Sequence, residues 1–178
     1  MSFVVPDEAQ TLGFELVVRT DKGLSSSAVR VELMTAQGGN VAGSAAVTAS
    51  SEAASNGQAA QKAVDGAITG YPGDAAAEWV TAGGKQGSWL TLTWDAPQTV
   101  SEVFLYDRFN SNDQITGGRV DCDDGSSTDF GELDNYGKPN RVDIGQRTIS
   151  SLTVTVTSVS PSTGNVGLAE IQVFGAAA

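Results

Sequence analysis

The chain contains no histidine and a single cysteine, Cys122, among its 178 residues. Without histidine it lacks the commonest general base of enzymes and the commonest transition-metal ligand. One cysteine cannot close an internal disulfide, and in an alternating segment it is typical of a small buried side chain. Because these absences exclude a Ser-His or Cys-His catalytic pair, we expect a protein that is not an enzyme.

Basic residues are scarce as well. Ten lysines and arginines stand against 21 acidic residues, which gives a net charge of −11. Nucleic acids and anionic membrane surfaces both require a basic footprint, so neither is an expected partner. No run approaches the ~20 apolar residues of a membrane-spanning helix, and we expect no membrane insertion. The start, Met1-Ser2-Phe3, lacks the basic residues and long apolar run of a signal peptide. The chain is therefore either cytosolic as written or a mature or excised piece of a longer exported protein, and we expect the second, with a secreted or cell-surface location.

Short runs of alternating apolar and polar residues dominate the chain and predict β-strands. The runs that we predict as strands are 46–49, 88–94, 100–106, 118–122, 127–130, 140–144, 151–158 and 167–174. Asp123-Asp124-Gly125-Ser126 is a strong hairpin-turn signal between two of them. About eight short strands separated by turn residues predict an all-β protein, a jelly-roll β-sandwich with an N-terminal β-hairpin.

The domain organisation follows from the same patterns. We predict a hairpin at residues 1–35, a linker at 36–44, the jelly roll at 45–175 and a tail at 176–178. Within the hairpin, Gly13–Arg19 and Ala28–Met34 are the predicted strands. A hairpin with an apolar face and open edges must pack on something. It either packs on the jelly roll or pairs with a second copy, which would make a homo-oligomer.

A polar patch follows the strand at 100–106 and is the candidate ligand site. Arg108 offers a planar fork of donors, and neighbouring amides and carboxylates donate or accept beside it. Aromatic residues in loops could supply a platform for a sugar ring. The predicted ligand-binding residues are Arg108, Asp107, Asn110, Asp113, Trp79 and Tyr71, with Phe109 and Tyr136 as further loop aromatics. A second interpretation stays open: Arg108 pairs internally with Asp107 or Asp113 and fixes the loop, while Trp79 belongs to the core.

Four phrases occur in a characteristic order, and they begin with VTASS at 47–51 and QAAQKAVDG at 58–66. They continue with Glu78-Trp79 plus GSWLTL at 87–92, and end with GLAEIQVFG at 167–175. With these phrases the chain resembles the discoidin family, the factor V/VIII type C domains, which are galactose-binding-like jelly rolls that include many carbohydrate-binding modules. The resemblance places Trp89 in the core. It does not extend to galactose specificity, because the pocket histidine of galactose-binding members is absent and a GYPGDAAAEW insert replaces a family Thr-x-Trp.

The same resemblance implies a structural calcium site. Asp65 and Glu170 would supply carboxylate oxygens, and Lys62, Ala67 and Ala169 are candidate carbonyl donors. Calcium takes six to eight hard oxygen ligands of this kind. The alternative is that Asp65 only closes an Asx turn and Glu170 is a solvated charge at a strand end.

Taken together, the sequence predicts a non-catalytic, lectin-like module that binds polysaccharide or glycan through its end loops. The alternative prediction is a self-assembling structural subunit of the fibre or surface-layer type, built by intermolecular pairing of the N-terminal strands. For these strands, LGFELVVRTDKGLSSSAVRVEL at 12–33 resembles the end of an immunoglobulin-like (polycystic-kidney-disease-like) module.

Overall fold

The computed structural model describes residues 10–19, 21–22, 25–35 and 38–175. The start of the predicted hairpin region (1–9), part of the predicted linker (36–37) and the predicted tail (176–178) lie outside the described residues. Only strands and short 3-10 helices occur in the described ranges. The strands are β1 Gln10–Leu16, β2 Val29–Thr35, β3 Ala46–Ala49, β4 Trp79–Val80, β5 Trp89–Asp107, β6 Ile115–Cys122, β7 Ser127–Phe130, β8 Asn140–Val159 and β9 Gly167–Phe174. The 3-10 helices are η1 Ala42–Ser44, η2 Ala54–Asn56, η3 Ala60–Val64 and η4 Ala75–Ala77.

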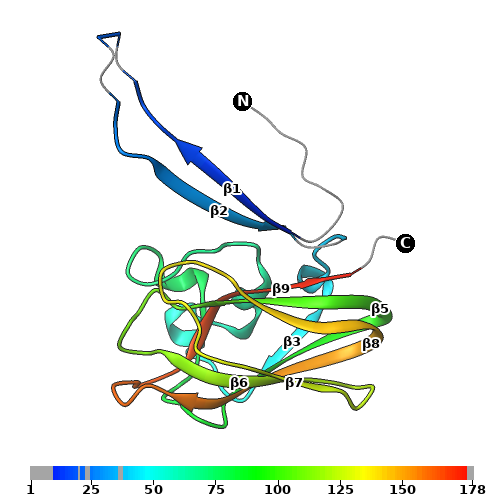
Figure 1. The fold of residues 1–178 in the computed structure, drawn as a ribbon. Coiled ribbons are helices and arrows are strands. Elements are labelled where there is room, and N and C mark those ends of the chain that lie inside the picture. Colours follow the sequence, from blue (N-terminus) through cyan, green and yellow to red (C-terminus); the bar gives the residue numbers. More distant parts are fainter. Residues whose placement is uncertain (1–9, 20, 23–24, 36–37, 176–178) are drawn as a thin grey trace.

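The main body is an antiparallel β-sandwich (Figure 1), which confirms the predicted fold class. Its strand order is β4-β9-β5-β8-β6-β7, and β3 also pairs with β5. Two long strands, β5 and β8, take part in both layers. The start of β5 pairs with β3 and the end of β8, whereas its end pairs with β9 and the start of β8. Bulges between these parts let each strand pass from one layer to the other.

The bulges explain where strand prediction differed from the structure. Residues 88–94 and 100–106 were predicted as two strands joined at Asp95-Ala96-Pro97, but they form the single strand β5, with an irregularity between Thr93 and Gln98. Likewise, 140–144 and 151–158 belong to the single strand β8. The predicted strands at 46–49, 127–130 and 167–174 match β3, β7 and β9. Gly125 (φ +86°) takes the left-handed conformation in the predicted hairpin turn between β6 and β7.

Alternation along β5 sets which side chains enter the core. Leu90, Leu92 and Trp94 are buried, so the residues between them point outward. Trp89 is 38% exposed. The expectation that Trp89 lies in the core is therefore wrong, because it has the opposite parity to Leu90 on the same strand.

The N-terminal strands form a sheet of their own. β1 pairs with β2 from Gln10–Thr35 to Leu16–Val29, and neither strand joins the sandwich sheet. Figure 1 shows this hairpin projecting from the sandwich. The first strand begins three residues earlier than Gly13, where it was predicted.

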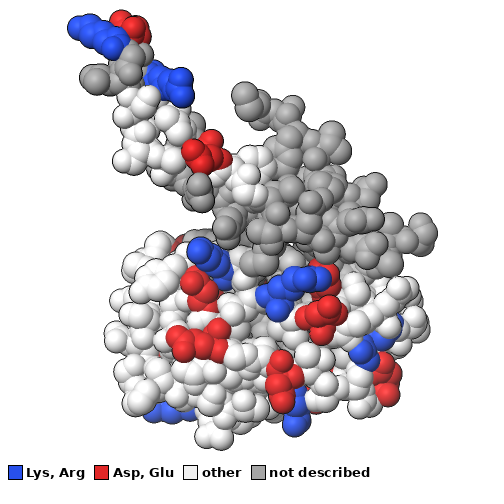
Figure 2. Space-filling model, in the orientation of Figure 1, with Lys and Arg blue, Asp and Glu red and all other residues white. Residues whose placement is uncertain are grey.

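The sandwich begins earlier than the predicted boundary at Ala45. Asn40 forms a bridge with Phe174 of β9, and its side-chain oxygen accepts the backbone N–H of Val173 at 3.0 Å. Ala42 of η1 is fully buried. Part of the predicted linker is therefore packed on β9. On the face of the sandwich shown in Figure 2, acidic and basic side chains alternate without a basic patch.

Candidate functional site

The chain makes a tight loop between the end of β5 and the start of β6. Asp107, the last residue of β5, accepts the backbone N–H of Arg108 at 2.9 Å. Its other carboxylate oxygen accepts the backbone N–H of Ile115, the first residue of β6, at 3.1 Å. Burial raises the pKa of Asp107 to about 7, although these two hydrogen bonds oppose the shift. Asp107 thus joins the two ends of the loop.

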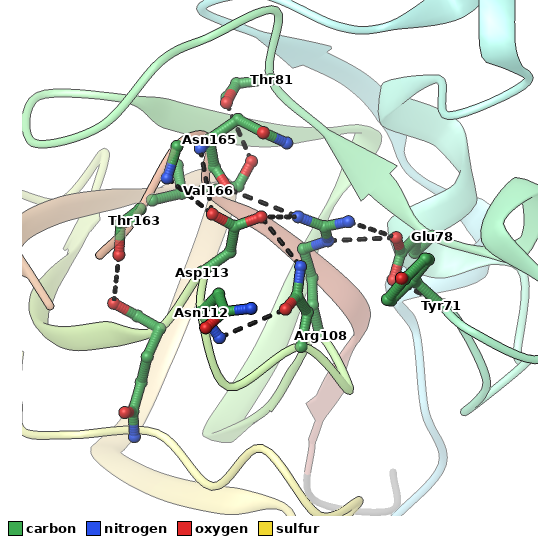
Figure 3. Close-up of polar contacts among 12 residues, drawn as sticks. Tyr71, Glu78, Thr81, Arg108, Asn112, Asp113, Thr163, Asn165 and Val166 are labelled. Carbon is green, nitrogen blue, oxygen red and sulfur yellow. Dashed lines mark hydrogen bonds and ion pairs between the residues drawn. The ribbon is translucent and has the colours of Figure 1, made fainter.

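Arg108 is buried at the base of this loop, with only 4% of its surface exposed. Its Nε and Nη2 donate to the same Glu78 carboxylate oxygen at 3.0 and 2.8 Å. Its Nη1 donates to Asp113 at 2.9 Å and to the backbone carbonyl of Asn165 at 3.3 Å (Figure 3). Every nitrogen of the guanidinium group is therefore engaged within the protein.

The two carboxylates around Arg108 extend the network to other loops. Glu78 also accepts the side-chain amide of Gln58 at 3.1 Å and the backbone N–H of Tyr71 at 3.2 Å. The second oxygen of Asp113 accepts the backbone N–H of Gly164 at 2.6 Å. Four segments that lie far apart in the sequence meet here: Gln58, 71–78, 108–113 and 164–165. We call the side chains of Gln58, Glu78, Arg108 and Asp113, with their backbone partners, the Arg108 network.

These contacts bear on the two interpretations of the polar patch. Asn110 donates to Asp113 at 3.0 Å and so belongs to the Arg108 network. Trp79 is 1% exposed, lies in the hydrophobic core and donates its indole N–H to the Ser51 carbonyl at 3.0 Å. Buried groups with satisfied partners are poorly placed to meet an external ligand. The geometry favours a loop-fixing role for Arg108, Asp113 and Asn110, and a core role for Trp79.

Tyr71 differs from the rest of the predicted ligand set because its side chain is 48% exposed. It stands at the edge of a shallow pocket of about 210 Å³. The pocket lies between the loop of the GYPGD insert and the loop after β5. Its lining residues are Thr69, Gly70, Tyr71, Pro72, Gly73 and Phe109. Among the lining residues, Gly70 lies directly against the Glu78 carboxylate, with no room for a side chain between them. Glu78 therefore supports the pocket from below.

A third aromatic residue lies on the adjoining loop. Tyr136 is 82% exposed. The next residue, Gly137, packs so closely on the Phe109 ring that an added Cβ would lie 2.8 Å from it. Asn135 donates its amide to the Arg108 carbonyl at 2.8 Å. The loop that carries Tyr136 is thereby anchored to the loop that carries Phe109.

Two of the predicted calcium residues, Asp65 and Glu170, also come close to each other in space. Glu170 is fully buried, and one of its oxygens accepts the backbone N–H of Gly66 at 3.3 Å. Its other oxygen, Oε1, has no hydrogen-bond partner among the described residues. Burial, together with the nearby negative charge of Asp65, raises the pKa of Glu170 to about 7, although the hydrogen bond from the Gly66 N–H opposes the shift.

Asp65 itself makes local contacts. It accepts the backbone N–H of Ala67 at 3.0 Å, which is the Asx-turn contact, and pairs with the Lys62 ammonium at 3.2 Å. Ala169 is buried next to Glu170. In the part of the chain that the structure describes, no group of three or more acidic, histidine or cysteine side chains could hold a metal ion. A cation here would therefore depend on backbone carbonyls for most of its ligands.

Sequence reasoning assigned neither Gln58 nor Glu78 to the Arg108 network, and Glu78 is the one that pairs with Arg108 itself. It stood out only as the neighbour of Trp79 in a family phrase. Its contact with Arg108, 30 residues away in sequence, has no local signal, because the two residues are joined only when β4 docks on β9 beside the end of β5.

Comparison with known proteins gives one family and a group of solved structures. A family model described as "Domain of unknown function (DUF7402)" matches residues 40–174. The lectin domain of lectinolysin, solved with the Lewis B antigen, has a TM-score of 0.62 and 22% identity over 78% of this chain and 98% of its own. CpGH89CBM32-5 from Clostridium perfringens, solved with GalNAc-β-1,3-galactose, has a TM-score of 0.60 and 17% identity over 77% of this chain and 100% of its own. Chitosan-binding module 1 from the chitosanase/glucanase of Paenibacillus sp. IK-5 has a TM-score of 0.60 and 21% identity, covering 77% of this chain and 99% of its own.

These likenesses show the fold: a discoidin-like, galactose-binding-like β-sandwich, as the sequence predicted. The match to the family model begins at residue 40, and the resemblance of the N-terminal strands to an immunoglobulin-like module finds no support. No curated protein matches the sequence. No helix among the described residues has the length and apolar character to cross a membrane.

Proposed function

The chain belongs to the family described as a domain of unknown function (DUF7402), and on that premise we propose that it is a non-catalytic carbohydrate-binding module. The solved structures of similar fold include a lectin domain and carbohydrate-binding modules bound to glycans, which supports this class of function. The ligand is a glycan or polysaccharide held at the loop end beside the Arg108 network. The module would act within a secreted or cell-surface protein.

The observation that carries the proposal is a shallow pocket lined by two aromatic residues, with a third exposed aromatic residue on the neighbouring loop. Tyr71 and Phe109 line the pocket, and Tyr136 stands exposed on the loop packed against Phe109. Aromatic faces receive the apolar face of a sugar ring, and a shallow pocket leaves the rest of a chain free to extend into solvent. None of the lining residues carries a carboxylate, imidazole or thiol.

Arg108 serves this site as a positioning residue. Through Glu78 it fixes Gly70 and Tyr71 on one side of the pocket, and its own loop places Phe109 on the other. The remaining predicted residues, Asp107, Asn110 and Asp113, support the same loop. Such a preformed site loses little conformational entropy when it binds a ligand.

The proposed module also holds a structural calcium ion beside Glu170. The residues fit a hard cation, because the unpartnered Glu170 Oε1 and the charge of Asp65 lie together and destabilise each other without one. Glu170 and Asp65 would supply carboxylate oxygens, and the carbonyls of Lys62, Ala67 and Ala169 would complete the set. The ion would hold the loop at Gly66 against β9.

A glycan array tests the proposal, followed by titration calorimetry with the best oligosaccharide. Tyr71→Ala and Tyr136→Ala are each expected to weaken binding about threefold to tenfold, the loss of one ring contact, with unchanged thermal unfolding. Val18→Ala is the matched control, since Val18 is exposed in the N-terminal region away from the pocket. A blank array, or full binding by both tyrosine variants, would count against this function or this site respectively.

A further inference from the structure

Trp89 occupies an environment unlike that of the other two tryptophans. Trp79 and Trp94 are buried, and each donates its indole N–H to a backbone carbonyl, of Ser51 at 3.0 Å and of Val41 at 2.9 Å. Trp89 is exposed, and its indole N–H donates to no described residue. A large ring with an unused donor on a strand is an uncommon feature of a sandwich surface, where the outward side chains are mostly polar.

The strand register places Trp89 in a row of side chains that crosses five strands. The row begins at Ser50, the residue just after β3. The backbone N–H of Ser50 donates to the carbonyl of its neighbour Trp89 at 2.9 Å. On its other side Trp89 pairs with Thr155, Thr155 with Arg119, and Arg119 with Asp129. Five strands spaced by ~4.8 Å make this row about 19 Å long.

A second row runs beside the first, two residues further along each strand. It joins Thr48, Thr91, Thr153, Asp121 and Ser127 in one line of register partners. The Thr91 and Thr153 hydroxyls lie 2.7 Å apart, and Ser127 donates its hydroxyl to Asp121 at 2.7 Å. The backbone beneath both rows is held by the buried leucines and valines of the core. These two rows form a firm surface, which we call the Trp89 face.

The chemistry of the Trp89 face selects its occupant. Its one cation, Arg119, pairs with Asp121 at 2.8 Å and lies opposite Asp129 in register, so no cation of the two rows is left to attract an anionic polymer. Trp89 is the only large apolar residue in the two rows, whereas protein interfaces have an apolar core of several residues. One aromatic ring among hydroxyl, carboxylate and guanidinium groups suits the alternating apolar faces and hydroxyl edges of an uncharged sugar chain.

We propose that the Trp89 face is a second carbohydrate-binding surface, which takes an extended, uncharged polysaccharide across the strands. It goes beyond the loop-end function, because it lies on the sheet rather than in the loops and shares no residue with the pocket. Trp89 stacks on a sugar ring, while Thr91, Thr153 and Thr155 exchange hydrogen bonds with the hydroxyls of neighbouring rings. Two surfaces on one module would raise its avidity for a polymer over that for a short oligosaccharide.

The test measures sedimentation of the full chain with microcrystalline cellulose, insoluble chitin and insoluble β-1,3-glucan at graded concentrations. We expect at least one polymer to bind, Trp89→Ala to weaken that binding about threefold to tenfold, and Trp89→Phe to retain most of it, because the phenyl ring keeps the stacking contact. Thermal unfolding of both variants reports folding. Acrylamide quenching of tryptophan fluorescence follows Trp89 selectively, since Trp79 and Trp94 are buried, and bound hydroxyethyl cellulose or laminarin should protect it.

Binding of none of the three polymers, or unchanged binding in a folded Trp89→Ala variant, would overturn the proposal, as would a soluble polymer that binds without altering the quenching of Trp89. A change of oligomeric state in Trp89→Ala would also overturn it, in favour of contact with a second copy. Failure here is distinct from failure of the loop-end site: Trp89→Ala should leave binding of short oligosaccharides on the array unchanged, whereas Tyr71→Ala should reduce it.

Discussion

Arg108 and Glu78 form a buried ion pair in which two nitrogens of the guanidinium share one carboxylate oxygen, at 3.0 and 2.8 Å. The pair connects the loop after β5 to the segment that leads into β4. A pair so deeply buried depends on complete hydrogen bonding, because removal of one partner leaves an uncompensated charge. We therefore propose that the pair supports the pocket and is not itself a surface open to ligands.

Removal of the Arg108 guanidinium should destabilise the fold. We expect Arg108→Ala to lower the free energy of unfolding by about 3–5 kcal/mol, because Glu78 and Asp113 would stay buried without their cation. Urea unfolding measures the change. Arg119→Ala is the control, since that arginine is half exposed and its pairing with Asp121 should contribute less than about 1 kcal/mol. A stable Arg108→Ala protein that loses glycan binding would instead make Arg108 a ligand contact.

Calcium should stabilise the chain through Glu170. Differential scanning calorimetry in millimolar calcium and in EDTA should show a melting temperature several degrees lower in EDTA. The reason is that a ligand that binds only the folded state stabilises that state. Glu170→Gln should abolish the difference, while Asp129→Asn, an acidic change away from the site, should preserve it. An identical melting temperature with and without EDTA would argue against the ion.

Stability in EDTA should fall as pH rises towards neutrality. Burial raises the pKa of Asp107 from 3.8 and of Glu170 from 4.5, each to about 7 in the folded protein. Between about pH 4 and about pH 7 the folded state therefore binds more protons than the unfolded state. The free energy of unfolding accordingly declines from about pH 4 to about pH 7 and levels off above that pH. Urea unfolding across this range measures the slope. Glu170→Gln should make it shallower, and an increase in stability over the range would contradict the assignment.

Deletion of residues 1–38 should leave the sandwich folded. β1 and β2 pair only with each other among the described strands, whereas Asn40 bonds to β9 and must be kept. We expect the shortened chain to melt within a few degrees of the full chain and to bind the same glycans. Light scattering after size-exclusion chromatography of both chains addresses assembly. A larger particle formed by the full chain alone would support intermolecular pairing of the hairpin.

Much of the fold could be predicted from local patterns. Alternation and turn chemistry located β3, β7 and β9 and the glycine turn after β6, because each depends on residues close in sequence. The same patterns divided β5 and β8, since Asp95-Ala96-Pro97 reads as a turn, and only pairing with partner strands makes it a bulge within a strand.

The polar patch after β5 shows the same division. The sequence by itself determined an acidic, histidine-free, all-β chain with a polar loop around Arg108. Whether that arginine faces a ligand or a carboxylate was decided by tertiary structure, because its main partner, Glu78, comes from a distant segment. Whether Trp89 faces the core or the solvent was likewise set by how β5 docks on the core. Alternation places the side chains of a strand on two faces, but it does not determine which face is buried.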